Sequence, residues 1–414
     1  MKKKIIVVGG GPAGMFAAIA AASNGAEVIL IERNHRLGAK LRITGKGRCN
    51  ITNIAEIETI MENISSNHKF FYSAIYSFTN EQVFAFFNDN GLPLKVERGG
   101  RVFPESDNAN HVVDFLEQQL QKTGVKIVAD TRVSSLIKEG KKILGVKSGN
   151  KEFYANAVIL CTGGLTYPKT GSSGDGHKIL KAENHTITQL LPALVPLEIA
   201  EGWVPELMGL ALKNVQVTAY LAEKELGQEF GEMLFTHFGV SGPIILTLSN
   251  YLTPHIGKDL RLEINLKPAL SQEQLDARVL RDLQKFANKQ LKNSLQELLP
   301  KKLIMPIICL TGIEEEKKCN QITKVQRESI VHILQHLSLH VTKARPMDEA
   351  IITKGGVSIK EINASTLESK LLENLYIAGE ILDLDAYTGG YNLQIAFSTG
   401  YLAGMSAISK EEMN

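Results

Sequence analysis

The sequence predicts an α/β protein of three layers, in which helices cover a mostly parallel sheet and an inserted module interrupts the chain. Residues 5–32 read as an apolar strand, a glycine turn, a helix, a second apolar strand and an acid. Two further apolar strands, at 157–161 and 375–378, also run into glycine turns. Strands that alternate with helices are typical of a parallel sheet. Between about residues 192 and 345 the pattern changes, which indicates the insertion.

The first glycine turn has the spacing that holds a dinucleotide. Gly9 allows a tight turn after the first strand, and Gly11 has no Cβ, so the backbone can approach a pyrophosphate closely. Gly14 lets the helix lie near the sheet, and the helix start offers free N–H groups to phosphates. Glu32 stands near the position of the acid that binds a ribose hydroxyl. We therefore predict cofactor contacts at Gly9, Gly11, Pro12, Ala13, Gly14 and Glu32.

The amino-terminal stretch also imitates a secretory signal. Three lysines, at 2–4, precede apolar and alanine-rich residues, and residues 20–23 resemble a cleavage site. The glycine–proline cluster would break the apolar helix that such a signal needs. A second strand that ends in an acid has no role in a signal either, so we favour nucleotide binding.

Composition predicts a soluble cytoplasmic protein without a metal centre. The chain has 414 residues and a formal net charge of only +2, so nothing global demands nucleic acid or an anionic membrane. Its four cysteines are scattered, without a CxxC pair or metal-ligand spacing. No stretch is long and apolar enough to span a bilayer. The oligomeric state is not predicted.

Between the second strand and the next glycine turn, the sequence predicts a mixed region. Thr79 and Gln82 form a capping box, and Gly91 is placed to end that helix. Segments 94–96 and 101–103 flank a Gly-Gly turn and predict a hairpin. A helix over about 110–123 follows. Short strands between 125 and 161 then predict an antiparallel meander beside the parallel sheet.

The insertion divides into two parts. Its first part is predicted to be β-rich, with strands at 215–221, 244–248 and 260–266. Its second part is predicted to be helical, with a capping box at Ser271 and Gln274. We therefore predict a discontinuous cofactor domain over 1–190 and 346–414, a β-rich domain over 191–270 and a helical domain over 271–345. The helical part has 13 Lys and Arg against 8 Asp and Glu, which is more typical of a solvated face than of a nucleic-acid site.

The two later glycine turns indicate a flavin rather than a nicotinamide cofactor. A buried strand leads into Thr162-Gly163-Gly164, and a strand near the carboxyl terminus leads into Gly379-Glu380 and then into Gly389-Gly390 before a helix. The acid can bind ribityl hydroxyls, and the helix start can face the flavin ring. Since no second strand–GxGxxG–helix unit is present, NADH or NADPH would have to dock directly against the flavin. The predicted contacts are Thr162, Gly163, Gly164, Gly379, Glu380, Gly390, Asn392 and Leu393.

These motifs resemble the two-dinucleotide-binding-domain flavoproteins, and among them the HI0933-like or aminoacetone-oxidase-like FAD-binding family. The resemblance covers nearly the whole chain and rests on segments 9–14, 45–53, 161–164, 170–176, 234–243, 353–357 and 378–394. In the family three glycines usually precede Arg-Cys-Asn, whereas here the middle position is Lys46. The resemblance implies a Rossmann-like FAD-binding domain with an inserted β-barrel and a helical module.

Candidate residues outside the glycine turns are less specific. Arg48 and Lys40 could neutralise the pyrophosphate or contact the flavin, or could form surface charge pairs. Cys49 could act in redox or proton transfer, although a lone cysteine is more often a packing residue. His237 could shuttle a proton, or could pack at a domain junction. The further predicted cofactor contacts are Arg33, Lys40, Gly47, Arg48, Cys49, Asn50 and Val133.

The sequence leaves three functions open. The first is an FAD-dependent oxidoreductase of a small molecule, either an amine or amino-ketone oxidase or a reductase of a conjugated C=C bond, with NADH or NADPH as a candidate reductant. The second is a flavin-dependent enzyme that reduces the C5=C6 bond of a uridine in ribosomal RNA. The third is a flavin-binding protein without catalysis.

Overall fold

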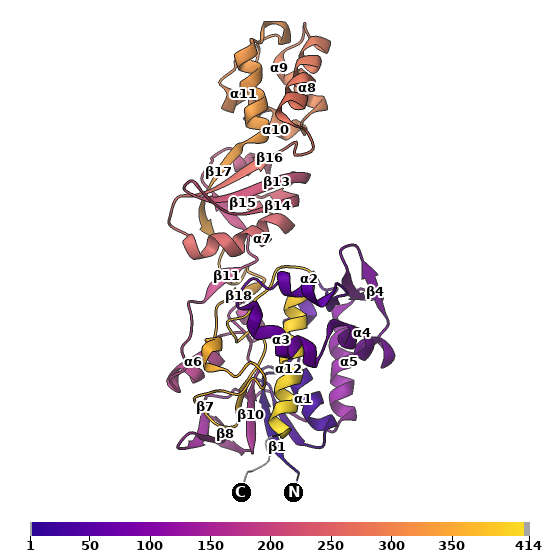
Figure 1. Ribbon diagram of the computed structural model, residues 1–414, viewed down its shortest axis with the longest axis vertical. Coiled ribbons are helices and arrows are strands. Elements are labelled where there is room, and N and C mark those ends of the chain that lie inside the picture. Colours follow the sequence, from indigo (N-terminus) through magenta and orange to yellow (C-terminus); the bar gives the residue numbers. More distant parts are fainter. Residues whose placement is uncertain (1, 410–414) are drawn as a thin grey trace. The chain divides into compact units, whose positions relative to one another are not determined.

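The computed structural model describes residues 2–409, which form two compact units. Unit 1 runs to Pro192 and resumes at Ala350, and unit 2 comprises Ala193–Glu349 (Figure 1). Unit 2 is therefore inserted within the sequence of unit 1. Each unit has its own hydrophobic core.

Unit 1 is built on a five-stranded sheet in the order β19 (Leu375–Ile377), β10 (Ala157–Leu160), β1 (Lys4–Val8), β2 (Glu27–Ile31) and β6 (Lys126–Val128). All neighbouring pairs are parallel. The strands are apolar because covering elements bury them, and Ile5, Ile6 and Val7 have no exposed surface. The predicted Rossmann-like α/β fold is confirmed.

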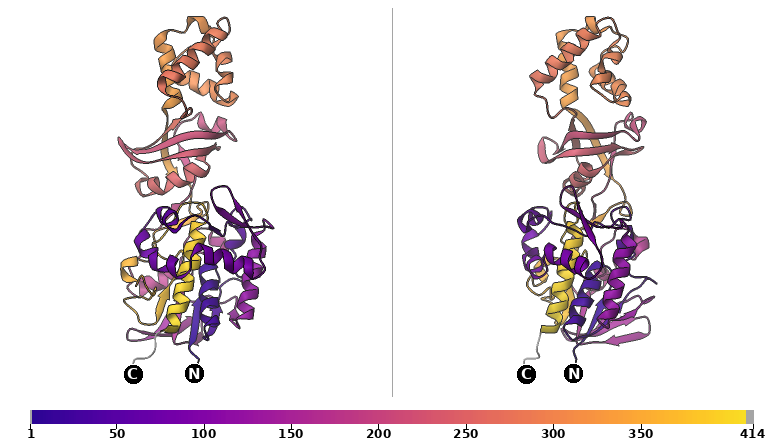
Figure 2. Two further views of the ribbon diagram at one scale, coloured as in Figure 1. Left: turned by 45° about the vertical axis from the view of Figure 1, so that its right-hand side comes forward. Right: turned by 90° about the vertical axis from the view of Figure 1, so that its right-hand side faces the viewer.

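Two helices from opposite ends of the chain pack together in unit 1. Helices α1 (Pro12–Ser23) and α12 (Tyr391–Ser409) lie side by side in every view (Figures 1 and 2). Glycines make this possible, because a Cβ at Gly400 would lie 2.2 Å from the carbonyl oxygen of Ala13, and one at Gly404 would lie 2.4 Å from that of Ala17. Helix α12 therefore belongs to unit 1, although it is far from α1 in the sequence.

The other elements of unit 1 follow the predicted order. Thr79 caps its helix with Gln82 in the predicted box, and the hairpin and the antiparallel meander are both present. The helices are α2 (Ile57–Glu62), α3 (His68–Ser77), α4 (Asn80–Asp89), α5 (Ala109–Lys122) and α6 (Asp175–Ala182). The strands are β3 (Thr52–Asn53), β4 (Leu94–Glu97), β5 (Arg101–Pro104), β7 (Ser135–Glu139), β8 (Lys142–Ser148), β9 (Lys151–Tyr154), β18 (Ile352–Lys354) and β11 (Leu191–Ala193), whose last residue is the first of unit 2.

Unit 2 contains a closed antiparallel barrel and a helical module. The barrel order is β12 (Leu197–Ile199), β15 (Gly239–Ser241), β14 (Lys224–Phe235), β13 (Ala211–Leu221), β16 (Leu260–Asn265) and β17 (Leu337–Ala344). The helices are α7 (Pro243–Leu252), α8 (Gln272–Lys285), α9 (Leu291–Ser294), α10 (Lys301–Thr311) and α11 (Lys324–Gln335). Ser271 and Gln274 form the predicted capping box of α8.

Two predictions for the insertion were wrong. Residues 244–248 were predicted as a strand but lie in α7, because Pro243 starts a helix there and Ile244, Ile245 and Leu248 are buried at helical spacing. Residues 337–344 were placed in the helical part but form β17. Buried and accessible side chains alternate along the first part of this strand, and both its edges are paired within the barrel.

Candidate functional site

Four predicted segments meet at the carboxyl edge of the unit 1 sheet. Strands β1, β2, β10 and β19 are parallel and in register, so the residues that follow them emerge along one edge. The amide of Gly9 donates to the carbonyl of Ile31 (2.8 Å), and the amide of Cys161 donates to that of Val8 (2.8 Å). A Cβ at Gly9 would lie 2.4 Å from the carbonyl oxygen of Cys161. The glycine turns after β1 and β10 are therefore in direct contact.

The start of α1 is open to an anion. Its N-cap, Gly11, has no capping side chain, and the first turn has no acid. The space where a Cβ at Gly11 would point is empty to 4 Å. In contrast, a Cβ at Gly14 would lie only 1.8 Å from the carbonyl oxygen of Gly9. Gly14 is thus required by the fold, whereas Gly11 faces free space in front of unpaired helix amides.

The start of α12 lies beside the loop that contains Gly47 to Asn53. Gly390 has a φ of +100°, and a Cβ there would lie 2.4 Å from the carbonyl oxygen of Thr52. With the Asn50 amide in the orientation that its neighbours favour, its side-chain oxygen accepts from the amide of Gly390 (3.0 Å). Asn392 bonds both backbone groups of Ala386 and so fixes the turn before the helix. The first turn of α12, which includes Leu393, contains no acid.

Glu32 is buried and oriented by backbone amides. One carboxylate oxygen accepts from Gly10 (2.7 Å) and the other from Asn34 (2.8 Å). The neighbouring Arg33 pairs with Asp175 (3.1 Å), which also binds Arg132. Burial raises the pKa of Asp175, but hydrogen bonds from Arg132 and Ser173 hold it below its usual value. The acid after β2 therefore lies at the sheet edge, as predicted.

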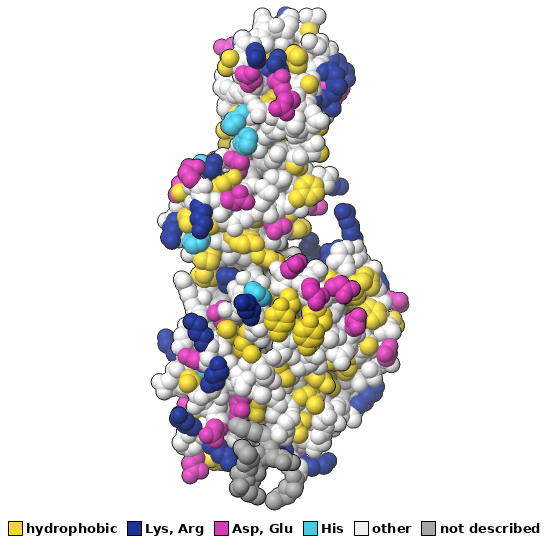
Figure 3. Space-filling model, in the orientation of Figure 1, with side chains coloured by type: hydrophobic (Ala, Val, Ile, Leu, Met, Phe, Trp, Pro, Cys, Tyr) yellow, Lys and Arg dark blue, Asp and Glu magenta, His cyan; other side chains and the backbone are white. Residues whose placement is uncertain are grey.

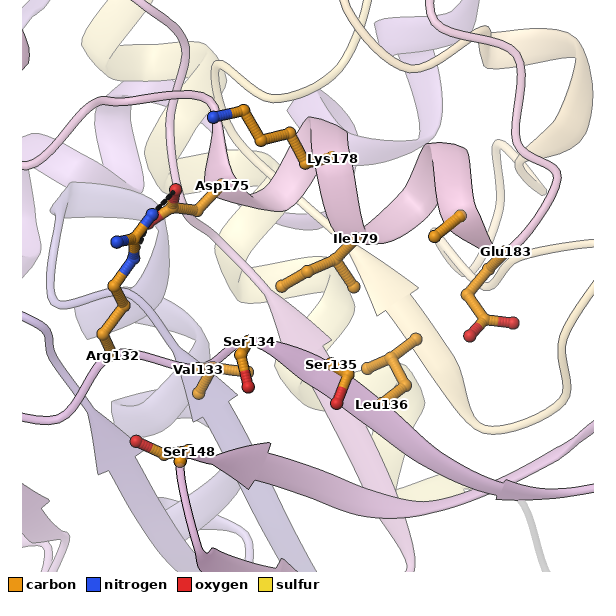
Figure 4. A pocket seen from close by; sticks show the side chains of 12 residues that line it. Arg132, Val133, Ser134, Ser135, Leu136, Ser148, Asp175, Lys178, Ile179 and Glu183 are labelled. Atoms are coloured by element: carbon orange, nitrogen blue, oxygen red, sulfur yellow. Dashed lines mark hydrogen bonds and ion pairs between the residues drawn. The ribbon is translucent and has the colours of Figure 1, made fainter.

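Val133 lines a cavity of about 560 Å³ between the meander and α6 (Figure 4). Its apolar lining includes Leu136 and Ile179, and the Arg132–Asp175 ion pair lies on one side. None of the glycine-turn residues lines this cavity. Val133 thus lies near Asp175, the partner of Arg33, but in a hollow separate from the glycine turns.

Lys40 and Glu380 form an ion pair at the end of β19. The ammonium of Lys40 lies 2.7 Å from one carboxylate oxygen of Glu380 and 2.9 Å from the other, and it also donates to the hydroxyl of Thr166 (2.6 Å). The amide of Thr353 donates to Glu380 (3.0 Å). A Cβ at Gly164 would lie 2.3 Å from the hydroxyl of Thr353. This network brings the loop after β2, the turn after β10 and the acid after β19 together.

Gly379 brings the turn after β19 into contact with the start of α1. A Cβ at Gly379 would lie 2.7 Å from the Cβ of Ala13, so the turn after β19 also touches the start of α1. The turn after β10 holds Thr162, whose buried hydroxyl has no hydrogen-bond partner among the described residues. Gly163 has a φ of +72° in the same turn.

Arg48 is bound away from the glycine turns, to carboxylates near the β4–β5 hairpin. It pairs with Glu97 and with Asp107 (2.6 Å), and its guanidinium lies 4.1 Å from the ring centre of Phe103. Gly47 accepts from the amide of Ala109 (2.7 Å) through its carbonyl group. Arg48 therefore anchors the loop, which corresponds to the charge-pair interpretation of this residue.

Cys49 is completely buried in a left-handed backbone conformation (φ +64°). Burial raises the pKa of its thiol far above the ordinary value, so the group is protonated at neutral pH. A buried, protonated thiol favours a packing role over redox chemistry.

We expect Cys49→Ala to retain the cofactor spectrum and turnover within about twofold. Cys49→Ser should lower the free energy of unfolding by about 1–3 kcal/mol, because a hydroxyl group would be buried without a hydrogen-bond partner. Urea unfolding and the flavin spectrum measure both effects. A loss of turnover above about 100-fold in the alanine variant, with normal flavin content, would instead support acid–base catalysis by Cys49.

His237 belongs to unit 2 and is exposed in the turn between β14 and β15. Its ring packs edge-on against Phe238, with the ring centres 4.9 Å apart. Glu349, also in unit 2, has a lowered pKa chiefly through hydrogen bonds from Arg345, with a small contribution from His237. The two candidate catalytic residues therefore belong to different units.

The geometry of unit 1 fits a dinucleotide with a flavin. The amino-terminal turns of α1 and α12 contain no acid, so their amide groups can bind an anion. The space beside Gly11 is empty, and the buried hydroxyl of Thr162 has no hydrogen-bond partner among the described residues. Glu32 follows β2 and Glu380 follows β19, so both acids lie at the same edge of the sheet. Among residues 2–409, no group of three His, Cys, Asp or Glu side chains could hold a metal. In that same range no helix is long and apolar enough to cross a membrane.

Comparison with known proteins extends this conclusion. Residues 3–406 match the family model described as HI0933-like protein Rossmann domain. The chain is 32% identical to 3-dehydro-bile acid delta(4,6)-reductase of Clostridium scindens, over 98% of this chain and 99% of that protein. It is 31% identical to ribosomal RNA dihydrouridine synthase of Haemophilus influenzae, over 97% of each.

One solved structure shows a similar fold. The 3-ketosteroid delta1-dehydrogenase of Sterolibacterium denitrificans has a TM-score of 0.50 and 12% identity, covering 99% of this chain and 100% of that one. The fold, the paired glycine turns and these matches define a Rossmann-fold flavoprotein of the oxidoreductase class. Within that class, the chain belongs to the HI0933-like family.

Proposed function

We propose that this protein is an FAD-dependent reductase of a C=C bond conjugated to a carbonyl group. The observation that carries the proposal is that four features lie at one edge of the unit 1 sheet. They are the amino-terminal ends of α1 and α12, which contain no acid, and the side chains of Glu32 and Glu380. When bound, FAD would supply the hydride chemistry. The two full-length relatives support the reaction type, because a delta(4,6)-reductase and a dihydrouridine synthase both saturate C=C bonds.

Within this proposal the chain's residues orient and hold the cofactor. We assign cofactor binding to segments 1–190 and 346–414, and substrate selection to 191–270 and 271–345. The helix starts at Gly11 and Gly390 would face the anionic pyrophosphate and the flavin ring. Glu32 and Glu380 would bind ribose and ribityl hydroxyls. NADH or NADPH would meet the flavin directly, since the sequence has no second dinucleotide motif. The four free cysteines support a reducing, cytoplasmic location.

A small conjugated carbonyl compound is the substrate that the charge distribution favours. Unit 2 contains 18 Lys and Arg against 19 Asp and Glu, a formal charge of −1. Figure 3 shows both signs interspersed over the visible face of the molecule. Proteins that grip RNA usually present a basic surface. The second candidate substrate is a uridine in ribosomal RNA. Two observations favour it: the excess of five basic residues in 271–345 and the similarity to a ribosomal RNA dihydrouridine synthase.

An anaerobic experiment tests the proposal. NADH or NADPH should bleach the flavin, and a 3-oxo-4,6-diene steroid should restore its colour, with one C=C bond saturated per reduced flavin. In a separate assay in air, peroxide formation with an amine and without nicotinamide would show an oxidase instead. For the RNA candidate, ribosomal RNA of a deletion strain should lack a dihydrouridine, and unchanged dihydrouridine there would exclude that substrate. Reduction without reoxidation by either substrate would contradict the reaction class.

A further inference from the structure

A charged cluster in unit 1 has no role in cofactor binding as described above. It comprises Lys354, Asp383 and Asp385, with Ser65 and Ser66, and is called the Lys354 cluster below. The ammonium of Lys354 donates to the Ser66 hydroxyl (2.9 Å) and lies 3.7 Å from the carboxylate of Asp385. The hydroxyl of Ser65 donates to that same carboxylate oxygen. The cluster therefore joins the loop between α2 and α3 to the segments around β18 and after β19.

Backbone contacts place the cluster at the edge of the proposed flavin site. Lys354 directly follows Thr353, whose amide binds Glu380 and whose hydroxyl accepts from the amide of Leu165. Asp385 lies between Glu380 and the Gly389-Gly390 turn that starts α12. The amides of Ser65 and Ser66 both donate to the carbonyl of Asp385 (2.8 and 3.4 Å).

The cluster holds a partly exposed lysine beside one buried and one half-buried carboxylate. The side chain of Asp385 is only 2% exposed, and its second oxygen has no hydrogen-bond partner among the described residues. Burial, and then the charge of Asp385, raise the pKa of Asp383. The side chain of Lys354 is 21% exposed. Asp385 and Ser66 thus hold the end of a lysine side chain that is partly exposed.

We propose that Lys354 donates the proton that completes C=C reduction, with Asp385 and Ser66 as positioning residues. The inference rests on the proposed function, in which bound FAD would supply a hydride to the carbon β to the carbonyl. The N–H bond of the Lys354 ammonium breaks as a C–H bond forms at the α carbon, so the double bond becomes a single bond. Lys354 is left as a neutral amine and regains its proton from water through the Ser66 hydroxyl. NADH or NADPH supplies the two electrons.

The test compares Lys354→Met with Lys360→Met in the FAD-loaded full chain. Lys360 is an exposed lysine six residues further on, so its variant controls for the loss of a charge. Both variants should keep wild-type flavin content, visible spectrum and rate of bleaching by NADPH. Reoxidation by the 3-oxo-4,6-diene steroid should slow by about 100-fold or more in Lys354→Met only, as expected for loss of a general acid. Methylamine should partly restore reoxidation in Lys354→Ala.

Two further readouts follow the proton into the product and test the positioning role of Asp385. In D₂O the wild type should place solvent deuterium at the α carbon of the product. Asp385→Asn should slow reoxidation by about tenfold, while steroid binding to the oxidised enzyme, followed by the flavin spectrum, should be unchanged. Wild-type reoxidation in Lys354→Met would overturn the proposal. Flavin loss in Lys354→Met that Lys354→Arg prevents would also overturn it, and would assign Lys354 to cofactor binding. If NADPH-reduced wild type is not reoxidised, both this proposal and the reductase function fail.

Discussion

Gly11→Ala is expected to leave the fold intact and to weaken FAD binding by about 100-fold or more, equivalent to about 2.7 kcal/mol. Gly11 has an ordinary extended backbone (φ −81°, ψ −177°) that alanine adopts readily. A Cβ there meets no protein atom within 4 Å, so the added methyl group projects into the space assigned to the pyrophosphate. The free energy of unfolding of the apoprotein should change by less than about 1 kcal/mol.

Gly14→Ala is the matched control, because its added methyl group meets protein rather than free space. A Cβ there would lie 1.8 Å from the carbonyl oxygen of Gly9, so α1 would have to move away from the sheet. We expect this variant to lose about 3 kcal/mol or more of apoprotein stability. Urea unfolding of the apoproteins and FAD titration measure the two effects separately. If Gly11→Ala binds FAD as tightly as the wild type, the start of α1 is not the pyrophosphate site.

Breaking the Lys40–Glu380 pair is the second large effect. Lys40→Met and Glu380→Gln should each lower the free energy of unfolding by about 1–3 kcal/mol, because each leaves a partly buried charge without its partner. Both side chains are about four-fifths covered, with exposed fractions of 21% and 23%. Each variant should also bind FAD more weakly, since the pair links the loop after β2 to the acid after β19.

The double variant Lys40→Met/Glu380→Gln shows whether the two residues act as one unit. Its loss of stability should be smaller than the sum of the single losses by about 0.5–3 kcal/mol. Urea unfolding of the four proteins gives this coupling energy. Additive losses would mean that Thr166 and Thr353 satisfy Glu380 without Lys40, and that the ion pair contributes little.

The cofactor half of the fold could be predicted because local sequence and tertiary contact agree there. Gly9, Gly14 and Gly390 are glycines because each lies very close to another part of the backbone. Gly9 and Gly390 lie in turns beside an apolar strand or a helix, and Gly14 lies in the first turn of α1. Such turns are recognisable from spacing alone. The capping boxes at Thr79 and Ser271 were equally local signals, and both are present.

The insertion and the charged side chains could not be predicted as well. Residues 244–248 are a short apolar run whose helical state depends on Pro243 and on packing against the barrel. The partners of Arg48 lie about 50 to 60 residues away, on or near a hairpin, so its local glycines suggested a cofactor contact. The carboxylate partner of Lys354 is 31 residues further on, at Asp385. The motif at 353–357 was visible, but only the fold shows what its lysine binds.

Titration of the apoprotein with FAD, followed by flavin fluorescence and by the visible spectrum, tests the central claim most directly. We predict saturation at one FAD per chain, with quenched fluorescence and a structured flavin spectrum. Wild type and Cys49→Ala should behave alike, whereas Gly11→Ala should require about 100-fold more FAD. A folded apoprotein that remains colourless and leaves the fluorescence of added FAD unchanged would contradict the flavin site at the carboxyl edge of the unit 1 sheet.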